Sequence, residues 1–225
     1  LTPQEFEEMV ENTGALMLDT RSPQEFAAGH IPNSIFIGLD GNFAPWVGAL
    51  IPDLQQPIVV IAPEGREEEA VTRLARVGYD HTLGYLKGGI EAWKAAGKEL
   101  DRVESIPAAE LESRFRQKLD GTLLDVRRPT EFLTQHVVGA VNFPLDYING
   151  NMHRLDRNAK YYIHCAGGYR SMITASILKS RGFHNVVDIQ GGWKAIEQTD
   201  LPKTEYTCPT TIPQEVLDEA IAQVS

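Results

Sequence analysis

The feature that most constrains the fold of this chain is an internal repeat. The segment Leu18-Asp19-Thr20-Arg21-Ser22-Pro23-Gln24-Glu25-Phe26 returns as Leu124-Asp125-Val126-Arg127-Arg128-Pro129-Thr130-Glu131-Phe132, and His30 recurs as His136 in the same register. Each half also contains a glycine pair followed by a tryptophan. The period is about that of one small domain. The sequence therefore predicts two copies of one fold, over residues 1–100 and 104–203, followed by a tail at 204–225 that contains a helix.

Each copy has the same order of apolar and helical patterns. Short apolar segments predict strands at 15–18, 35–37, 58–61 and 82–86, and again at 122–126, 141–143, 161–165 and 186–189. Helices are expected at 3–10, where Thr2 and Glu5 form a capping box, at 67–77 and at 172–181. Strands that alternate with helices are typical of an α/β fold, here two domains with a mainly parallel sheet and helices on both faces. Ser105-Ile106-Pro107 is expected to open the second copy as Thr2-Pro3 opens the first, and 97–104 to link them.

Composition excludes several classes of protein. The formal net charge of −10 argues against nucleic acid or an anionic membrane as a partner. The two cysteines, Cys165 and Cys208, cannot form a disulfide framework, and such low usage favours a reducing, cytoplasmic compartment. Apolar runs are too short for a membrane span, and no His-x-His or Asp-His cluster suggests a metal, so we expect neither metal nor cofactor. A start at leucine is consistent with a fragment of a longer protein.

The stretch with most chemical information is His164-Cys165-Ala166-Gly167-Gly168-Tyr169-Arg170-Ser171. It places a cysteine where a buried strand ends, at the edge of a parallel sheet at which ligands bind. Glycines let successive backbone N–H groups point inward around an anion, and the N-terminus of the following helix adds positive potential. Both effects favour a thiolate, the nucleophilic form of cysteine. The alternative is that Cys165 is buried packing, which is common for isolated cysteines.

Cys-x-x-Gly-x-Arg-Ser after a strand resembles the active-site loop of rhodaneses, a family of sulfurtransferases. The resemblance covers nearly the whole chain, including both Asp-x-Arg segments. It implies that Cys165 takes a sulfane sulfur from a donor, holds it as a persulfide and passes it to an acceptor. It also implies that residues 166–171 (Ala166, Gly167, Gly168, Tyr169, Arg170 and Ser171) bind the persulfide. Four residues separate the cysteine from the arginine, whereas related phosphatases have five, which disfavours phosphatase activity.

The same resemblance implies roles for the side chains around the loop. Asp125 and Arg127 are expected to form a buried ion pair that supports the loop. His164 lies next to Cys165 on a strand and therefore points to the opposite face, so it is interpreted as packing rather than as a base. The implied partners are small-molecule sulfur donors and acceptors: thiosulfate, sulfite, and glutathione or another thiol persulfide.

The first copy is expected to be inactive. When Arg66 is aligned with Arg170, Ile61 falls on Cys165, and the loop reads Ala62-Pro63-Glu64-Gly65. Pro63 removes an N–H donor, and Glu64 places negative charge where an anion would bind. This loop also resembles the tandem rhodanese half of fusions with a metallo-β-lactamase-fold domain, which implies an iron-dependent persulfide dioxygenase domain preceding residue 1. The alternative function is a non-catalytic binding or regulatory module that serves such a dioxygenase.

The tail carries a second thiol and an amphipathic helix. Pro213 and the apolar residues that follow predict a final helix that either docks on the second domain or makes a dimer or interdomain contact. Cys208 could receive sulfur from Cys165 or resolve it as a disulfide, or it could be a spare surface thiol.

Overall fold

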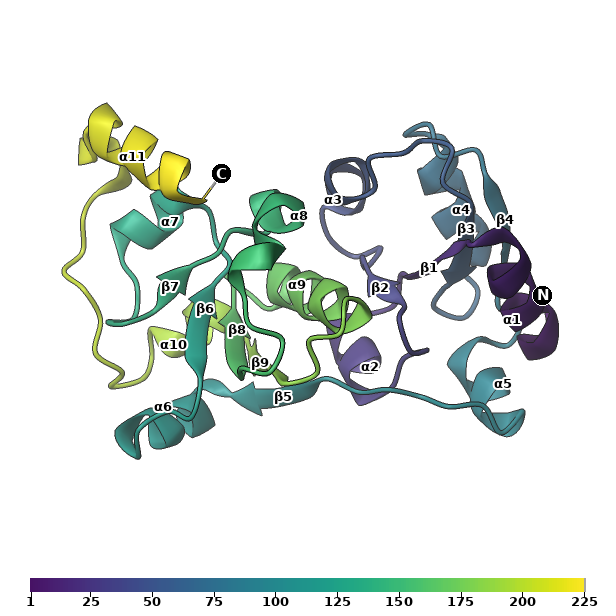
Figure 1. Ribbon diagram of the computed structural model, residues 1–225, viewed down its shortest axis with the longest axis horizontal. Helices are drawn as coiled ribbons and strands as arrows, with labels where there is room; N and C mark the ends of the chain where they lie inside the picture. The colour runs from purple at the N-terminus through teal and green to yellow at the C-terminus, as the bar shows by residue number, and fades with distance from the viewer. Residues whose placement is uncertain (225) are drawn as a thin grey trace. The chain divides into compact units, whose positions relative to one another are not determined.

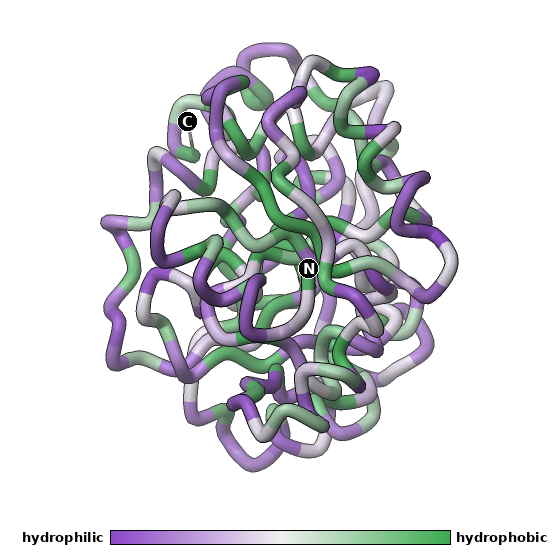
Figure 2. The backbone as a smooth tube through the Cα atoms, turned by 90° about the vertical axis from the view of Figure 1, so that its right-hand side faces the viewer, coloured by the Kyte–Doolittle hydropathy of each residue, from purple (hydrophilic) through white to green (hydrophobic). Residues whose placement is uncertain are grey.

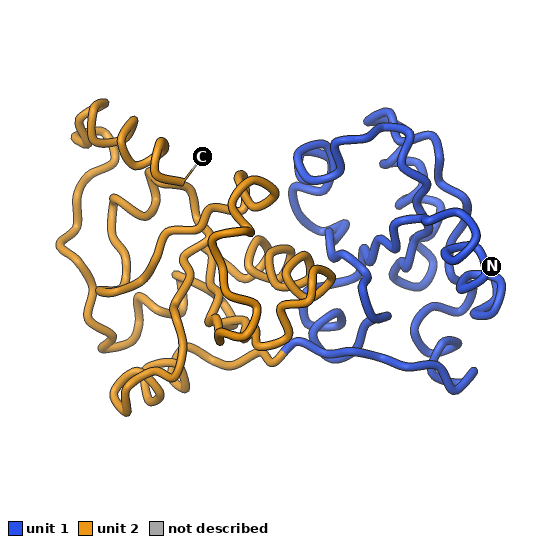
Figure 3. Tube along the Cα trace, in the orientation of Figure 1, with its two compact units in different colours: residues 1–103 blue, residues 104–225 orange. Residues whose placement is uncertain are grey.

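The computed structural model describes residues 1–224 and divides into two compact units, Leu1–Val103 and Glu104–Ser225 (Figure 3). They are called the first and second domain below. Each is built on one parallel sheet, four-stranded in the first domain with order β2-β1-β3-β4 and five-stranded in the second with order β5-β9-β8-β6-β7. The expected α/β fold with two parallel sheets is confirmed.

The elements of the first domain alternate as the repeat predicts. In chain order they are α1 (Pro3–Thr13), β1 (Leu16–Asp19), α2 (Pro23–Ala28), β2 (Ile35–Phe36), α3 (Phe43–Leu50), β3 (Ile58–Ile61), α4 (Glu67–Ala75), β4 (Thr82–Tyr85) and α5 (Gly89–Ala95). The expected capping box starts α1, because the Thr2 hydroxyl accepts a hydrogen bond from Glu5 N while the Glu5 carboxylate accepts one from Thr2 N.

The second domain repeats this order and adds to it (Figure 1). Its elements are β5 (Glu104–Pro107), α6 (Ala108–Arg116), β6 (Thr122–Asp125), α7 (Pro129–Thr134), β7 (Val141–Asn142), the 3₁₀ turns η1 (Leu145–Tyr147) and η2 (Met152–Arg154) on either side of α8 (Ile148–Asn151), β8 (Tyr161–His164), α9 (Tyr169–Ser180), β9 (Val186–Gln190), α10 (Gly192–Ile196), η3 (Pro209–Thr211) and α11 (Gln214–Val224).

Apolar side chains cover both faces of each sheet. In the second domain, Leu111 of α6 and Trp193 and Ile196 of α10 pack with Tyr162 and Val187 on one face, and α9 covers the other face against β8 and β9. β3 and β8 are buried along their whole length, as expected for central strands of a two-sided parallel sheet. Figure 2 shows the same partition, with apolar residues concentrated in inner segments and hydrophilic residues in the outer turns.

Two expectations about the second domain are wrong in detail. Glu104–Pro107 forms an edge strand paired with β9, rather than the start of a helix as at Thr2-Pro3. α9 begins at Tyr169 rather than Met172, because the chain turns into the helix directly after Gly168. The loop after β8 is therefore short, and Arg170 and Ser171 lie in the first turn of the helix.

The C-terminal helix packs within the second domain. α11 contacts α7, and the carbonyl of Val224 accepts a hydrogen bond from the Asn151 amide. Arg154 donates a hydrogen bond to the carbonyl of Gln223. Of the two interpretations of this helix, the structure has the docked one. None of the helices within residues 1–224 has the length and apolar character needed to cross a membrane.

Candidate active site

Cys165 lies at the carboxyl end of β8, in the turn that leads to α9. Gly168 has φ 101°, a left-handed conformation that side-chain-bearing residues rarely adopt. This conformation turns the Gly168 backbone N–H toward the cysteine, and the N–H donates a hydrogen bond to Sγ over 3.1 Å. The cysteine is only 1% exposed. The sulfur thus sits at the start of a twelve-residue helix, with an N–H donor directed at it.

The loop carries its other predicted residues in different environments. Ala166 and Tyr169 are partly buried, and Gly167 is exposed. The loop backbone is held from behind by the start of α10, where Trp193 N donates to the carbonyl of Cys165 over 2.7 Å and Lys194 N donates to that of Ala166 over 3.1 Å. These two hydrogen bonds fix the carbonyls away from the sulfur, so that the N–H side of the loop faces it.

A buried polar chain runs from the sulfur into the sheet. Sγ lies 3.6 Å from the Ser171 hydroxyl. That hydroxyl donates to Asp188 Oδ1 over 2.7 Å, and the Ser105 hydroxyl donates to Asp188 Oδ2 over 2.8 Å. Asp188 lies on β9 and is 3% exposed. Burial raises the pKa of Asp188 to about 6, although both serine hydroxyls act to lower it.

Asp188 was not expected from the sequence. It sits in the apolar run Val186–Ile189, which was assigned only as a buried strand. The available signal was the charge itself, because a carboxylate in a buried strand needs partners. Ser105 and Ser171 supply them, and neither is near Asp188 in the sequence.

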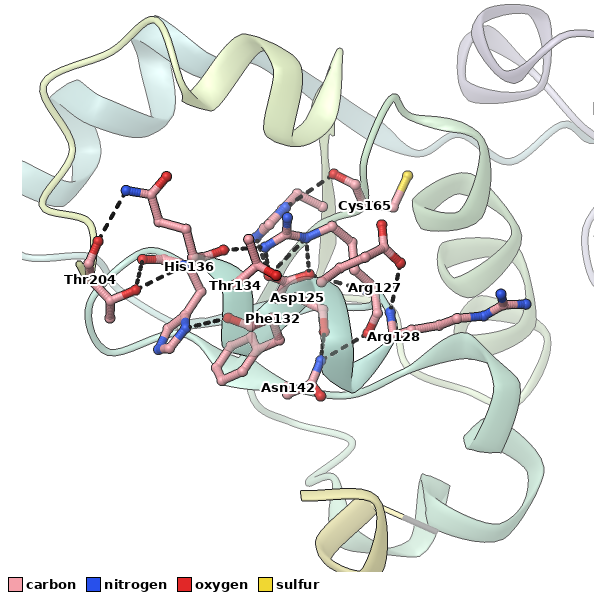
Figure 4. Close-up of polar contacts among 12 residues, drawn as sticks. Asp125, Arg127, Arg128, Phe132, Thr134, His136, Asn142, Cys165 and Thr204 are labelled. Carbon is pink, nitrogen blue, oxygen red and sulfur yellow. Dashed lines mark hydrogen bonds and ion pairs between the residues drawn. The ribbon is translucent and has the colours of Figure 1, made fainter. Parts of the chain in front are cut away.

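Asp125 and Arg127 form a buried ion pair behind the loop (Figure 4). The guanidinium Nη2 lies 2.6 Å from Asp125 Oδ2 and also donates to the carbonyl of Gln135. It stacks 4.3 Å from the centre of the Trp193 ring. Since Trp193 N binds the carbonyl of Cys165, the pair is connected to the loop through the tryptophan.

His164 is fully buried, and its two ring nitrogens face the carbonyl of Cys165 and the carboxylate of Asp125 rather than the thiol. Its Nδ1 lies 3.2 Å from the carbonyl of Cys165, which can only accept, so Nδ1 carries the hydrogen. Its Nε2 lies 3.6 Å from Asp125 Oδ2. Burial lowers the pKa of His164, which leaves the imidazole neutral at pH 7. The ring therefore positions the strand end and is not placed as a base for Cys165.

Arg170 connects the first turn of α9 to α7. Its two terminal nitrogens bind the two carboxylate oxygens of Glu131 over 2.7 and 2.8 Å. Burial opposes the charge on the guanidinium, but the Glu131 carboxylate outweighs it and raises the pKa of Arg170. The expected fixed cation is thus present, and Glu131 holds it in place.

In the first domain the sheet register places Ala62, not Ile61, at the position of Cys165. Asp19 pairs with Ile61 across β1 and β3, as Asp125 pairs with His164 across β6 and β8. The alignment from the arginines was therefore one residue off, because only three residues separate Ala62 from Arg66. The first domain has a shorter loop as well as a missing thiol.

A hollow of about 540 Å³ remains at this place in the first domain. The charged residues that line it are Glu25, Glu64, Glu67, Glu91 and Arg21, so the acidic residues outnumber the basic one. This negative lining disfavours an anionic sulfur species.

Cys208 lies apart from this site in the primary structure and is exposed, directly before η3. Hydrogen bonds from Thr210 lower its pKa. Within residues 1–224, no cluster of three or more His, Cys, Asp or Glu side chains is arranged to hold a metal ion.

The family model described as "Rhodanese-like domain" matches the sequence of this chain twice, at residues 2–96 and 107–199. The chain belongs to the rhodanese-like family. The first match lies in the first domain and the second match in the second domain, so the rhodanese-like domain is repeated in tandem.

Relatives of known name share one such domain with this rhodanese. "Putative sulfur carrier protein YrkF" of Bacillus subtilis is 34% identical over 98 residues, which is 42% of this chain and 52% of YrkF. "Thiosulfate sulfurtransferase GlpE" of Pseudomonas aeruginosa is 32% identical over 96 residues, 42% of this chain and 83% of GlpE. The chain thus spans only about half the length of YrkF.

One solved structure of similar sequence has a rhodanese-like domain by its title. A rhodanese-like domain protein from Staphylococcus aureus is 29% identical, with a TM-score of 0.42, and the match covers 47% of this chain and 100% of that one.

Proposed function

We propose that the second domain is a sulfurtransferase and that Cys165 carries the sulfur. The observation that supports this most directly is the hydrogen bond from Gly168 N to Cys165 Sγ at the start of α9. Backbone N–H groups and a helix N-terminus stabilise negative charge on sulfur, which both the thiolate and the persulfide carry. The name of GlpE, a thiosulfate sulfurtransferase, supports the same reaction class.

The proposed reaction has two displacements. The Cys165 thiolate attacks the outer sulfur of thiosulfate, the S–S bond of thiosulfate breaks, and sulfite leaves with the bonding electron pair. Cys165 is then a persulfide whose terminal sulfur is negative. An acceptor such as a thiolate or sulfite attacks that terminal sulfur, and the Cys165 thiolate leaves. With a thiol persulfide as the donor, a thiolate leaves in place of sulfite.

The residues around the loop have supporting roles in this proposal. The N–H groups of residues 166–171 surround the persulfide, and Arg170 adds positive potential while Glu131 holds its side chain. Asp125 and Arg127 keep the loop backbone in place through Trp193. The first domain, without a thiol and with an acidic hollow, has no sulfur-carrying role.

The test is the intact mass of the protein after incubation with thiosulfate and, separately, with glutathione persulfide. We expect the parent to gain one sulfur atom and Cys165→Ser to gain none. Cys208→Ser is the matched control, because it removes the exposed thiol and should still take up sulfur. Uptake that persists in Cys165→Ser would contradict the role of Cys165. A parent that takes up sulfur from neither donor would leave the non-catalytic binding module as the function.

A further inference from the structure

The buried chain from Cys165 to Asp188 has the parts of a proton relay. We propose that Asp188 is the internal proton acceptor for Cys165 and that it acts through the Ser171 hydroxyl. The proposal rests on the role of Cys165 as the nucleophile. In this proposal Asp188 does not contact the substrate. It is a positioning residue that acts on the thiol proton through Ser171.

The geometry fits a transfer through one hydroxyl. Ser171 Oγ lies 3.6 Å from Cys165 Sγ and 2.7 Å from Asp188 Oδ1. When Asp188 is ionised, the hydroxyl donates to the carboxylate, so toward the thiol it can only accept. The thiol proton is therefore directed at Ser171 Oγ, with a base on the far side.

The transfer balances without any further reactant. The S–H bond of Cys165 breaks and its proton passes to Ser171 Oγ, while the original hydroxyl proton passes to Asp188 Oδ1. The products are a Cys165 thiolate and a neutral Asp188. The Ser171 hydroxyl now donates to the thiolate, and Asp188 donates to Ser171. The same hydroxyl can then donate to the persulfide in the next step.

Asp188 is suited to accept a proton because its charge is poorly compensated. It is 3% exposed and is held by two neutral hydroxyls, from Ser105 and Ser171. Within residues 1–224 it takes part in no ion pair, whereas the buried Asp125 is paired with Arg127. A buried carboxylate without a cation binds a proton more readily than one in water.

The first domain lacks the thiol and also lacks the groups that connect the thiol to Asp188. The sheet register places the exposed Tyr85 at the position of Asp188, because Val60 pairs with Tyr85 as Ile163 pairs with Asp188. Glu67 follows Arg66 at the place where Ser171 follows Arg170. The buried carboxyl and the hydroxyl that connects it to the thiol therefore have no counterparts at the matching positions of the first domain.

Other ionisable groups lie on the elements that pack against β9. None of them is among the causes that shift the pKa of Asp188. The elements that pack against β9 carry these titratable or charged side chains: Glu104 of β5; Glu110, Glu112, Arg114 and Arg116 of α6; Tyr161, Tyr162 and His164 of β8; and Tyr169, Arg170 and Lys179 of α9. Burial and the two serine hydroxyls alone shift the pKa of Asp188, to about 6. Because the pKa of the neighbouring His164 also lies below its ordinary value, a titration near pH 6 is assigned to Asp188 when Asp188→Asn removes it.

The experiment follows alkylation of Cys165 by iodoacetamide as a function of pH, in a Cys208→Ser background. Alkylation needs no sulfur transfer, so a failure of the relay is distinguishable from a failure of the proposed function. The parent should show a plateau above about pH 6 and an acid limb below it, in which the rate falls about tenfold per pH unit because Asp188 already holds a proton. Asp188→Asn and Ser171→Ala should both lose the plateau, so that the rate falls continuously from higher pH without a break near pH 6.

Ser105→Ala separates a relay from a structural role. It leaves the path from Cys165 through Ser171 intact and removes one hydroxyl that stabilises the Asp188 carboxylate. The break between plateau and acid limb should therefore move up by about one pH unit. A break that stays in place in Ser105→Ala, or that survives near pH 6 in Asp188→Asn or Ser171→Ala, overturns the proposal.

Discussion

The close approach of Gly192 to the cysteine loop gives a sharp prediction. Gly192 has φ 55°, and a Cβ built on it would lie 2.4 Å from the carbonyl oxygen of Cys165 and 2.9 Å from the carbonyl carbon of Ala166. Both neighbours are backbone atoms, so neither can rotate away. Gly192→Ala must therefore displace the loop or the start of α10.

The repeat supplies a matched control at Gly89. Gly89 has φ 57°, and its added Cβ would meet nothing closer than the carbonyl oxygen of Ala62 at 4.0 Å. Both alanine variants share the strain of a left-handed conformation, roughly 1–2 kcal/mol. Only Gly192→Ala adds the clash, about 1–3 kcal/mol, and weakens two hydrogen bonds from α10 to the loop, about 1 kcal/mol each. We expect Gly192→Ala to cost about 3 kcal/mol more than Gly89→Ala.

Hydrogen exchange read by mass spectrometry measures the two domains separately. The free energy of opening of peptides that contain β8 should fall in Gly192→Ala by about 3 kcal/mol more than that of β3 peptides falls in Gly89→Ala, which corresponds to roughly a hundredfold difference in protection. Equal losses in the two variants would refute the argument, because they would mean that backbone strain alone matters at this position.

Two further predictions concern charge. The pKa of Asp188, about 6, lies above its ordinary 3.8, so the stability that it contributes is present below pH 4 and is lost as the pH rises through 6. The free energy of unfolding of Asp188→Asn, measured in urea, should therefore rise relative to that of the parent by up to about 3 kcal/mol between pH 4 and pH 7. A difference between variant and parent that does not change with pH would refute this. Ala62→Cys in a Cys165→Ser background should take up no sulfur from thiosulfate by intact mass, because Pro63 lacks an N–H, Glu64 is negative and the loop is short. Sulfur uptake equal to that of the parent would show that loop length and charge do not matter.

The repeat is the reason why most of the fold could be predicted. Central strands such as 58–61 and 161–164 are continuous apolar runs, and each was supported by its counterpart in the other copy. Strand 58–61 has the predicted ends, and the ends of the other predicted strands differ by at most one residue, because hydrogen bonding to neighbouring strands decides where a strand ends.

The elements that were missed depend on contacts that local sequence does not contain. β5 has one buried residue, Ile106, and ends in a proline, so its strand conformation comes from pairing with β9. α3 contains Pro45 and Gly48, which both weaken a helical pattern. The start of α9 was placed too late because Gly167-Gly168 resembles a longer loop, although Gly168 acts as the cap of the helix.

The candidate site was predicted where the chain is contiguous and missed where it is not. Residues 165–171 form one segment, and its spacing identified the loop. Asp188 and Ser105 come from β9 and β5, and only the register of the sheet brings them to Ser171. The same register corrected the position of Ala62, which an alignment on arginine had shifted by one residue.

The Asp-x-Arg ion pair occurs in both domains with nearly identical geometry. Arg21 Nη2 binds Asp19 over 2.6 Å and donates to the carbonyl of Gly29, as Arg127 binds Asp125 and Gln135. The chain thus contains its own reference state, a domain that has this scaffold with Ala62 at the position of the cysteine. A feature common to both halves can be assigned to folding, and one confined to the second half is a candidate for chemistry. By that criterion, replacing Asp19 and Asp125 should impair the two halves alike, although only one of them has a thiol to lose.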